Sequence, residues 1–407
     1  MGPLTGVRIL DLSRVLAGPW ATQCLADFGA TVWKIEKPGS GDDTRQWGPP
    51  WLNDRCGRAS SESAYFLGTN RGKKSIAVDL SQPRGQALIR RLAARADVLV
   101  ENFKVGGLAR YGLDWPSLQA VNPALVYCSI SAFGQDGPEA AGAGYDAMMQ
   151  GKGGLMSLTG NPAGEPGGNP QKVGVAVCDL MTGMYAVAGI LAALYERRGS
   201  GQGQRLDLAL LDTQVAMLAN QNMNYLLTGR SPQRLGTAHP NLVPYQAVPA
   251  ADGDFMLAVG NDRQFTDFCR VAGHEDVARD PRFATNAARV ANRRELLVDI
   301  EHWCRSQPRA WWLTRLTRED VPCGPINDLA AVFAEPQVRH RGMRIDLPHP
   351  LAGSVPQVRN PLLFSRTQLE YEHAPPLLGQ HTAQVLSQET GLDLGVLAEL
   401  RTAGVIG

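Results

Sequence analysis

Residues 173–212 read VGVAVCDLMTGMYAVAGILAALYERRGSGQGQRLDLALLD, and the rest of the chain is interpreted outward from this stretch. Asp179 is its first acid, and no other charged residue lies between Lys172 and Glu196. A helix over residues 180–194 that is apolar on almost every face must be buried. Polar and apolar residues then alternate over 205–211, which predicts a strand. The pattern places Asp179 at, or just before, the N-terminus of a buried helix.

Two interpretations of Asp179 follow from that position. As a helix N-cap, its carboxylate would accept a hydrogen bond from a backbone N–H near Thr182. As a nucleophile, its ionised form would be stabilised by the helix dipole and by free N–H groups, and it would stay reactive at neutral pH. The local pattern favours the cap, although the two roles are compatible. Cys178 beside it is more typical of a small buried residue than of a thiol nucleophile.

Composition narrows the classes of function. A formal charge of +1 over 407 residues predicts no general attraction to nucleic acid or to an anionic membrane. The uncharged run after Asp179 is shorter than the roughly 20 apolar residues of a membrane span. Seven scattered cysteines with no CxxC pair argue against a zinc site or a disulfide framework. From the charge, the short apolar run and the cysteine pattern we expect no nucleic-acid partner, no membrane partner and no metal. No secretory leader is visible, and the unpaired cysteines fit a reducing compartment, so we expect a cytoplasmic protein.

The first half of the chain has the pattern of an α/β fold. Apolar strands are expected at 7–13, 31–35, 74–80, 97–102 and 125–131, with helices at 18–29 and 82–96. This alternation predicts a parallel, doubly wound sheet whose strand-end loops, at 39–42, 101–106 and 133–138, carry the site. Neither GTNRGKK at 68–74 nor GSGQGQ at 199–204 has the spacing or context of a nucleotide-binding loop.

The second half changes character. A Gly/Pro-rich loop at 160–174 precedes Asp179, and a helix is expected near 212–227. A hairpin at 243–260 and helices at 262–271, 293–305 and 309–318 then predict a separate small domain. Strand-like segments at 344–347 and 361–364 and a short helix at 382–388 complete the chain.

Several segments together carry a family resemblance. They are LDLSRVLAGPWATQCLADFGATVWKIEKPGSGDDTR, NRGKKSIAVDL, ADVLVENF, SAFGQDGP, GYDAMMQ and CDLMTGMYAVAGILAALYERRGSGQGQ. In order and combination the chain resembles class III CoA-transferases, the CaiB/BaiF family that includes formyl-CoA transferase. The resemblance implies an interlocked homodimer, each subunit having a Rossmann-like large domain and a smaller α+β domain. It places the large domain at 1–225, the small domain with its linkers at 226–330, and a return segment completing the large domain at 331–407.

The resemblance also implies roles for individual residues. The family's nucleophilic aspartate aligns with Asp179, which reverses the preference for a simple cap. CoA contacts are implied at Val15, Ala17, Lys37, Val78, Asn102, Phe103 and Arg110. Cations suit phosphates and an aromatic face suits adenine, although Val78 also fits a core position and Lys37 a solvated one. Coenzyme A thioesters are then substrates, and no permanently bound cofactor is expected.

The acyl end of the site is implied in the same way. Tyr145 and Asp146 would line the acyl pocket, and the backbone N–H groups of Gly260 and Asn261 would stabilise an oxyanion above Asp179. Formyl-CoA transferase has a run of glycines where this chain has only Gly260, and it has histidine and glutamine at the positions of Arg14 and Leu16. Oxalate and formate are therefore not the expected substrates.

A finer match lies in the second half. The segments GTAHPNLVPYQAV, AVGNDRQF, VPCGPINDLAAVFAEPQV and PPLLGQHT resemble the branch containing succinyl-CoA:glutarate CoA-transferase. That resemblance implies dicarboxylate substrates, whose second carboxylate needs a cation or several donors. The candidates are Arg14, Arg45 and His239. Their alternative roles are a CoA phosphate contact, a solvated loop residue and a structural histidine, respectively.

Three other functions compete with CoA transfer. An α-methylacyl-CoA racemase would use a histidine where this chain has Tyr145, and a phenol with a pKa near 10 is a poor base at neutral pH. A nicotinamide dehydrogenase would need the missing glycine fingerprint. A non-catalytic acyl-CoA-binding protein would keep the cations and lose the acid, yet Asp179 is present. The expected partners are an acyl-CoA, a carboxylic acid and a second copy of the chain.

Overall fold

The computed structural model describes residues 1–407, and the chain divides into two compact units. Unit 1 contains residues 1–154, 173–222 and 339–407, and unit 2 contains residues 155–172 and 223–338. The chain therefore leaves unit 1 and returns to it twice.

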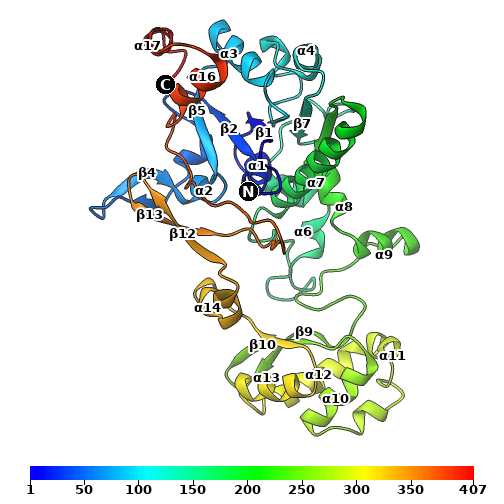
Figure 1. Cartoon of the computed structure of the whole chain (residues 1–407). Helices are drawn as coiled ribbons and strands as arrows, with labels where there is room; N and C mark the ends of the chain where they lie inside the picture. Colours follow the sequence, from blue (N-terminus) through cyan, green and yellow to red (C-terminus); the bar gives the residue numbers. More distant parts are fainter. The chain divides into compact units, whose positions relative to one another are not determined.

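Unit 1 is built on a six-stranded sheet in the order β5-β2-β1-β6-β7-β8, in which every neighbouring pair is parallel (Figure 1). The strands are β1 (Arg8–Asp11), β2 (Thr31–Glu36), β5 (Lys73–Ala77), β6 (Val98–Glu101), β7 (Val126–Ser131) and β8 (Arg205–Ala209). The parallel α/β sheet predicted from the sequence is thereby confirmed. Because all strands run the same way, the loops after them gather at one edge of the sheet, where α/β proteins bind ligands.

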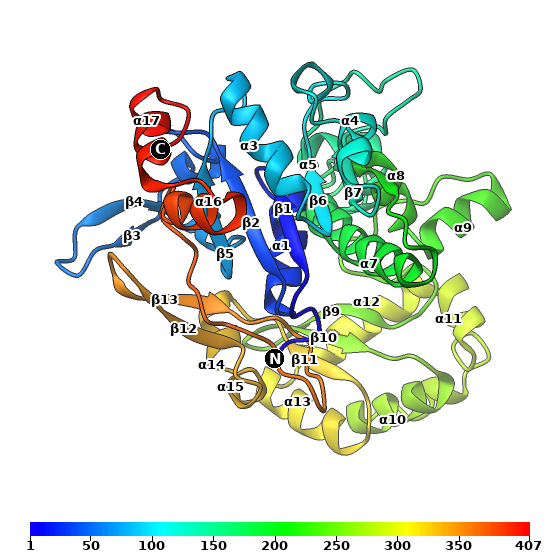
Figure 2. The ribbon, with the colours of Figure 1, turned by 45° about the horizontal axis from the view of Figure 1, so that its top comes forward.

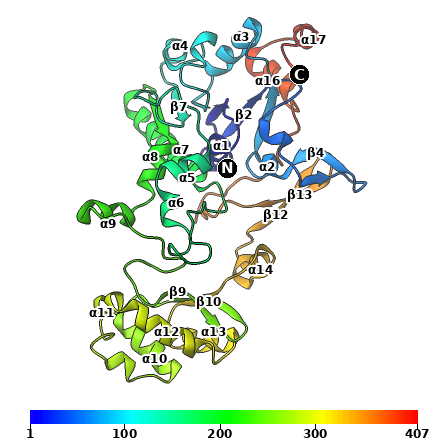
Figure 3. The same ribbon diagram turned by 180° about the vertical axis from the view of Figure 1, so that it is seen from behind.

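Both faces of the sheet are covered, so its strands are apolar on both sides. Ile9 packs in a core with α1 (Ala17–Asp27) and α7 (Val177–Ser200), whereas Leu10, the next residue, packs with α3 (Pro83–Ala93). The short helices α2 (Ala64–Leu67), α4 (Trp115–Val121), α5 (Asp146–Lys152) and α8 (Leu210–Ala216) also belong to unit 1. Figure 3 shows α5, α7 and α8 grouped together, and the three helices contact one another.

The C-terminal segment completes this unit. Helix α16 (Thr382–Thr390) packs on β5 and α3, and α17 (Leu394–Thr402) packs on α16 (Figure 2). The backbone N–H of His381 donates to the carbonyl of Ser75 at 2.9 Å, and Val78 forms a β-bridge with Ile406. Residues far apart in sequence therefore share one core.

Helix α7 is longer than the apolar run that predicted it. It begins two residues before Asp179 and ends at Ser200. The next residue, Gly201, has a φ of 70°, the left-handed conformation that favours glycine at a helix end. By length and composition α7 is the one helix apolar enough to cross a membrane. Within unit 1 it packs on α1 so closely that a Cβ on Gly183 would lie 2.7 Å from the carbonyl of Ala17.

Other segments depart from the sequence-based expectation. The helix expected at 212–227 is two helices, α8 and α9 (Asn220–Thr228), separated where Ala219 adopts a φ of 45°. The strand expected at 361–364 is wrong: Leu362, Leu363 and Phe364 are exposed and have no neighbouring strand to pair with. The strand expected at 344–347 is present as β12 (Arg344–His349) and pairs with β13 (Gly353–Val358). A hairpin of β3 (Trp51–Asn53) with β4 (Ala59–Ser63) was not expected.

Unit 2 has its own sheet and core. Its antiparallel strands follow the order β11-β10-β9, namely β9 (Tyr245–Ala250), β10 (Gly253–Ala258) and β11 (Cys323–Pro325). Phe255, Phe268 and Trp312 anchor its apolar cluster. Its helices are α6 (Leu155–Leu158), α10 (Asp262–Ala272), α11 (Asn286–Ala291), α12 (Arg293–Cys304), α13 (Arg309–Arg318) and α14 (Leu329–Ala334), and α15 (Pro336–His340) runs to the return into unit 1. The predicted hairpin and the three predicted helices are present.

Candidate active site

Asp179 lies in the first turn of α7 and does not cap the helix. The N-cap residue is Ala176, which has no side-chain acceptor. The Asp179 carboxylate makes no hydrogen bond within the protein, and burial, followed by the nearby Asp146 carboxylate, raises its pKa to about 7. An aspartate without protein partners that ionises near neutral pH is suited to attack an electrophile.

The hydrogen-bond acceptor for the backbone N–H groups at the start of α7 is a side chain of another helix, α5. Asp146 Oδ1 accepts hydrogen bonds from the backbone N–H of Cys178 at 2.8 Å and of Asp179 at 3.3 Å. Asp146 Oδ2 accepts from the Gln150 amide at 2.6 Å. The predicted substrate residue Asp146 therefore has its carboxylate committed to the protein and is not among the residues that line the pocket.

A pocket of about 180 Å³ opens over Asp179. Its wall brings together residues that the sequence placed in separate groups. The implied CoA contacts among them are Val15, Ala17, Asn102 and Phe103, and the implied substrate residues are Arg14 and Tyr145. The pocket thus joins the loops after β1, β6 and β7 to the N-terminus of α7.

The loop after β1 is held in a strained shape. Val15 has a φ of 70°, which is rare for a β-branched residue and marks a constrained position. Its N–H faces both oxygens of Asp42 at 3.3 Å, and Asn102 exchanges two hydrogen bonds with the backbone of Arg14, at 2.9 and 2.7 Å. The backbone of this wall is therefore fixed by side chains from two other loops.

A buried charge network lies beneath that loop. Lys34 is fully buried and donates to Asp42 Oδ2 at 2.9 Å and to the carbonyl of Ser13 at 3.0 Å. Burial opposes ionisation of Asp42, but Lys34 and hydrogen bonds from Thr44 outweigh it and lower the Asp42 pKa to about 2. Burial lowers the pKa of Lys73 to about 8 even though Asp11 lies 3.1 Å away.

Three implied CoA residues lie outside the pocket. Lys37 is exposed after β2, and Arg110 is exposed with its guanidinium 4.6 Å from the ring centre of Tyr111. Val78 follows β5 and is 1% exposed within the apolar core, so only its backbone is available to a ligand. Lys37 and Val78 nevertheless follow strands of the same sheet edge as Val15 and Asn102, so one elongated ligand along that edge can reach them.

The two arginines that could bind a second substrate carboxylate lie in different surroundings. Arg14 lines the pocket, is half-exposed, and pairs with Asp43 at 3.2 Å. Arg45 is not a free cation, because its guanidinium is buried and donates to Glu36, to Glu62 and to the carbonyl of Pro376. This position supports neither predicted role of Arg45, the substrate cation or the solvated loop residue.

The remaining predicted residues belong to unit 2. The Gly260 N–H donates to the side chain of Gln264 at 2.8 Å, and the Asn261 side chain caps α10 by accepting from the Gln264 N–H at 3.0 Å. His239 Nδ1 accepts from the backbone of Asn241 at 3.0 Å. Each group has a local partner within its own unit.

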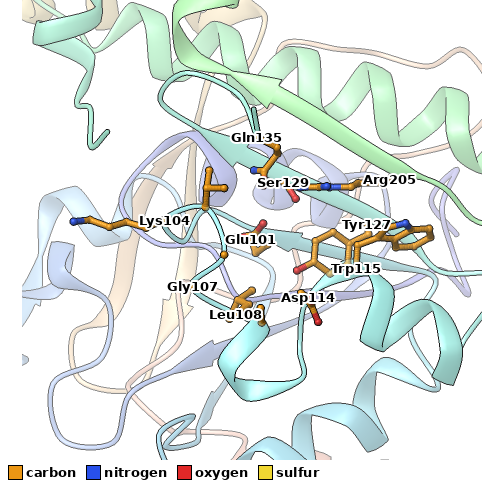
Figure 4. Close-up of a pocket in the computed structure, with 13 residues that line it drawn as sticks. Glu101, Lys104, Gly107, Leu108, Asp114, Trp115, Tyr127, Ser129, Gln135 and Arg205 are labelled. Carbon is orange, nitrogen blue, oxygen red and sulfur yellow. The ribbon is translucent and has the colours of Figure 1, made fainter. Parts of the chain in front are cut away.

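A second cavity, of about 220 Å³, lies behind the loop after β6 (Figure 4). It shares Lys104 and Val105 with the first pocket. The buried carboxyl of Glu101 also lines it, and burial raises the pKa of this carboxyl. Glu101 Oε2 also accepts from the N–H of Phe103 at 2.8 Å. This acid supports the Asn102–Phe103 wall from behind.

Sequence reasoning missed the residues that hold the site rather than line it. Gln150, Asp42 and Lys34 are buried polar side chains, and each has a partner 8 to 27 residues away along the chain. For Gln150 and Lys34 the signal is a charge or amide inside an otherwise apolar strand or helix, as at Lys34 in TVWKIE, whereas Asp42 lies in the loop after β2. No group of three or more His, Cys, Asp or Glu side chains is arranged to hold a metal ion.

The geometry can be compared with known proteins. Residues 4–382 match the model of CoA-transferase family III. A succinate–glutarate CoA-transferase of Agrobacterium fabrum is 53% identical over 390 residues, covering 95% of each chain. The human succinyl-CoA:glutarate CoA-transferase is 41% identical over 404 residues, covering 99% of this chain and 90% of the relative.

Solved structures agree with this. The crystal structure of a CaiB/BaiF family protein from Brucella suis is similar with a TM-score of 0.84 and 48% identity, covering 95% of this chain and 99% of the other. The family match extends across both units, and the relatives match in sequence as well as in fold. We conclude that this chain belongs to CoA-transferase family III and is a CoA-transferase.

Proposed function

We propose that this enzyme moves CoA from succinyl-CoA to a dicarboxylate such as glutarate through an aspartyl-CoA thioester on Asp179. The observation that carries the proposal is the unpartnered Asp179 carboxylate at the pocket whose wall contains Arg14. The names of the similar enzymes from Agrobacterium fabrum and human support the choice of acids.

The reaction proceeds by balanced acyl exchanges. The Asp179 carboxylate attacks the thioester carbonyl, forming a mixed anhydride and releasing CoA thiolate. The thiolate attacks the Asp179 carbonyl, forming the aspartyl-CoA thioester and releasing the donor acid. An acceptor carboxylate attacks this thioester and expels the thiolate, which then attacks the acceptor acyl carbon and restores free Asp179. Each step exchanges similar leaving groups, so one difficult transfer becomes several easier ones.

The protein contributes position and charge to these steps. The N-terminus of α7 places positive partial charge beside the Asp179 carboxylate, which stabilises its ionised form against the burial that opposes it. We propose Gly260 and Asn261 as oxyanion donors. For Gly260 this role requires its N–H to exchange the Gln264 side chain for the substrate oxygen.

We propose Arg14 as the partner of the second substrate carboxylate. Its guanidinium already pairs with a carboxylate, that of Asp43, and both side chains are about half exposed at the pocket. An exposed ion pair of this kind stabilises a protein by at most about 1 kcal/mol, so a substrate carboxylate can replace Asp43 at little cost. A planar guanidinium grips a carboxylate with two parallel hydrogen bonds.

Two further properties belong to the proposal. The working form is an interlocked homodimer, supported by the family resemblance and by the exposed apolar side chains Met184, Tyr185 and Tyr195 along α7. The protein acts in the cytoplasm, supported by seven cysteines that form no disulfide.

The nucleophile is tested by Asp179→Asn, with Asp212→Asn as its control. Asp212 is also an acid in the first turn of a helix, but it is exposed and does not line the pocket. We expect Asp179→Asn to lower kcat by at least about 10³-fold and to lose the aspartyl-CoA adduct seen by mass spectrometry with succinyl-CoA. Asp212→Asn should keep both. Near-normal transfer in Asp179→Asn would refute the nucleophile.

The substrate is tested by comparing glutarate with butyrate and valerate as acceptors. We expect Arg14→Gln to lose about 10-fold or more in kcat/KM with glutarate, because the second substrate carboxylate loses its charged partner, and to change little with the monocarboxylates. Arg84→Gln, an exposed arginine of α3, is the matched control. Equal preference for monocarboxylates in the unmodified enzyme would refute dicarboxylate specificity and leave CoA transfer intact.

A further inference from the structure

The start of α7 depends on a side chain that the proposed reaction does not use. The first N–H groups of any helix lack partners within that helix, and Ala176 at the N-cap supplies none. Asp146, on α5, supplies the acceptor for two of them. The position of the nucleophile thus depends on how Asp146 is held.

Gln150 holds Asp146. It lies one turn further along α5 and is fully buried. Its Nε2 donates to Asp146 Oδ2 at 2.6 Å and faces the carbonyl of Val175 at 3.3 Å, while its Oε1 accepts from the N–H of Val173 at 2.8 Å. The Val173 donor and the Val175 and Asp146 acceptors fix which end of the amide is oxygen and which is nitrogen.

We propose that Gln150 is a positioning residue for CoA transfer: its amide bridges Asp146 and the chain entering α7, and this bridge fixes the Asp179 carboxylate against the thioester. The inference rests on the proposed role of Asp179. A reacting carboxylate must be within a few tenths of an ångström of its attack position, and a shift of about 1 Å can cost 10²-fold in rate. Held by Gln150, Asp146 accepts the hydrogen bonds from the backbone N–H groups at the start of α7. The Asp179 carboxylate is then left without a partner in the protein.

The Asp146 carboxylate also acts electrostatically on Asp179. Asp146 helps to raise the pKa of Asp179, and two acids so close would separate if neither were anchored. The Gln150 amide and the N–H groups of Cys178 and Asp179 are the anchors. The same bridge therefore keeps the two acids at a fixed separation.

Gln150→Met tests the bridge, with Gln214→Met as its control. Methionine has a similar length and makes none of the three hydrogen bonds. Gln214 lies on α8 of the same unit, is equally buried, and its two amide atoms have no hydrogen-bond partner. We expect Gln150→Met to lower kcat about 10- to 100-fold while KM for succinyl-CoA changes less than about twofold, because the pocket wall is untouched. Gln214→Met should leave kcat and KM unchanged.

A swap separates positioning from mere stability. Gln150→Glu keeps the acceptor for Val173, loses the donor to Asp146 and adds a like charge beside it, so activity should fall. In the double variant Asp146→Asn/Gln150→Glu, the new amide at position 146 donates to the new carboxylate at position 150 and still accepts from Cys178. We expect the double variant to recover at least about tenfold in kcat over Gln150→Glu, because the bridge is restored with its polarity reversed.

The outcomes distinguish this inference from the proposed function. Inactive Asp179→Asn with fully active Gln150→Met would refute the positioning role alone, whereas active Asp179→Asn would refute the nucleophile. No recovery in the double variant, with melting temperature and secondary structure retained, would assign the effect to the charge of Asp146 and overturn the bridge. Equal losses of kcat in Gln150→Met and Gln214→Met would show that both substitutions act by destabilising the core. That result would also overturn the positioning role of Gln150.

Discussion

The chemistry of this protein is concentrated in one residue whose surroundings set its charge near neutral pH. Burial and the Asp146 carboxylate raise the pKa of Asp179 to about 7. Other groups near it titrate outside the same range: burial raises the pKa of the Cys178 thiol to about 12, and burial with Asp179 and Asp146 raises the pKa of Tyr65 to about 12.

We therefore expect kcat/KM to depend on a single ionisation near pH 7. Only the ionised carboxylate attacks, so the rate should rise tenfold per pH unit below about pH 7 and level off above it. The measurement is kcat/KM for succinyl-CoA from pH 5 to pH 9 in buffers of constant ionic strength. A profile flat from pH 5 to pH 7 would show that the reacting group ionises well below the value expected for Asp179.

At the scale of elements, the loop after β1 is held by charges buried beneath it. Val15 keeps its left-handed backbone while its N–H faces Asp42, and Asp42 is held by Lys34. Removing one partner of a buried ion pair typically costs about 3–5 kcal/mol, because the other charge is left uncompensated. The pocket wall and the stability of unit 1 are thus coupled.

Asp42→Asn should lower the free energy of unfolding by roughly 3 kcal/mol or more at pH 7, and should raise KM for succinyl-CoA. Denaturant unfolding is the measurement, and Asp43→Asn is the control, because the neighbouring Asp43 forms an exposed pair worth at most about 1 kcal/mol. The Asp42 pKa is depressed in the folded state, so its contribution is present above the unfolded value of 3.8 and is lost as pH falls toward about 2. The unfolding free energies of the unmodified protein and Asp42→Asn should therefore converge toward acid pH. A difference that stays constant with pH would contradict a stabilising ion pair between Asp42 and Lys34.

At the scale of the whole molecule, we expect a homodimer whose subunits do not separate without unfolding. Sedimentation should give twice the chain mass of 43.9 kDa at all concentrations that can be measured. Subunits that thread through each other must unfold to exchange, so mixing tagged and untagged protein should yield no mixed dimer over hours, whereas co-expression should. A stable, active monomer on dilution would contradict this assembly.

Much of the fold was predictable because it depends on local patterns. Continuous apolar strands alternating with helices predicted the parallel sheet, and the apolar run after Asp179 predicted α7. The helices of unit 2 were predicted from the same periodicity, whereas the strand expected at 361–364 was wrong because a strand also needs a partner that its own residues do not specify. The family resemblance brought Asp179, Val15 and Asn102 together, and all three line one pocket.

The sequence by itself therefore determined the sheet, its covering helices, the apolar composition of α7 and the acid at its start, because each follows from residue periodicity and from charge within a short window. The expectation that α7 is buried on almost every face is wrong for this chain, because Met184, Tyr185 and Tyr195 are exposed. Only the tertiary structure decided which polar side chains are free. Arg45 and Arg14 look alike in sequence, yet one is buried between Glu36 and Glu62 and the other stands at the pocket. Asp146 looks like a pocket residue and instead caps a helix 32 residues away. A charge's role is set by partners that fold against it, and those partners are distant along the chain.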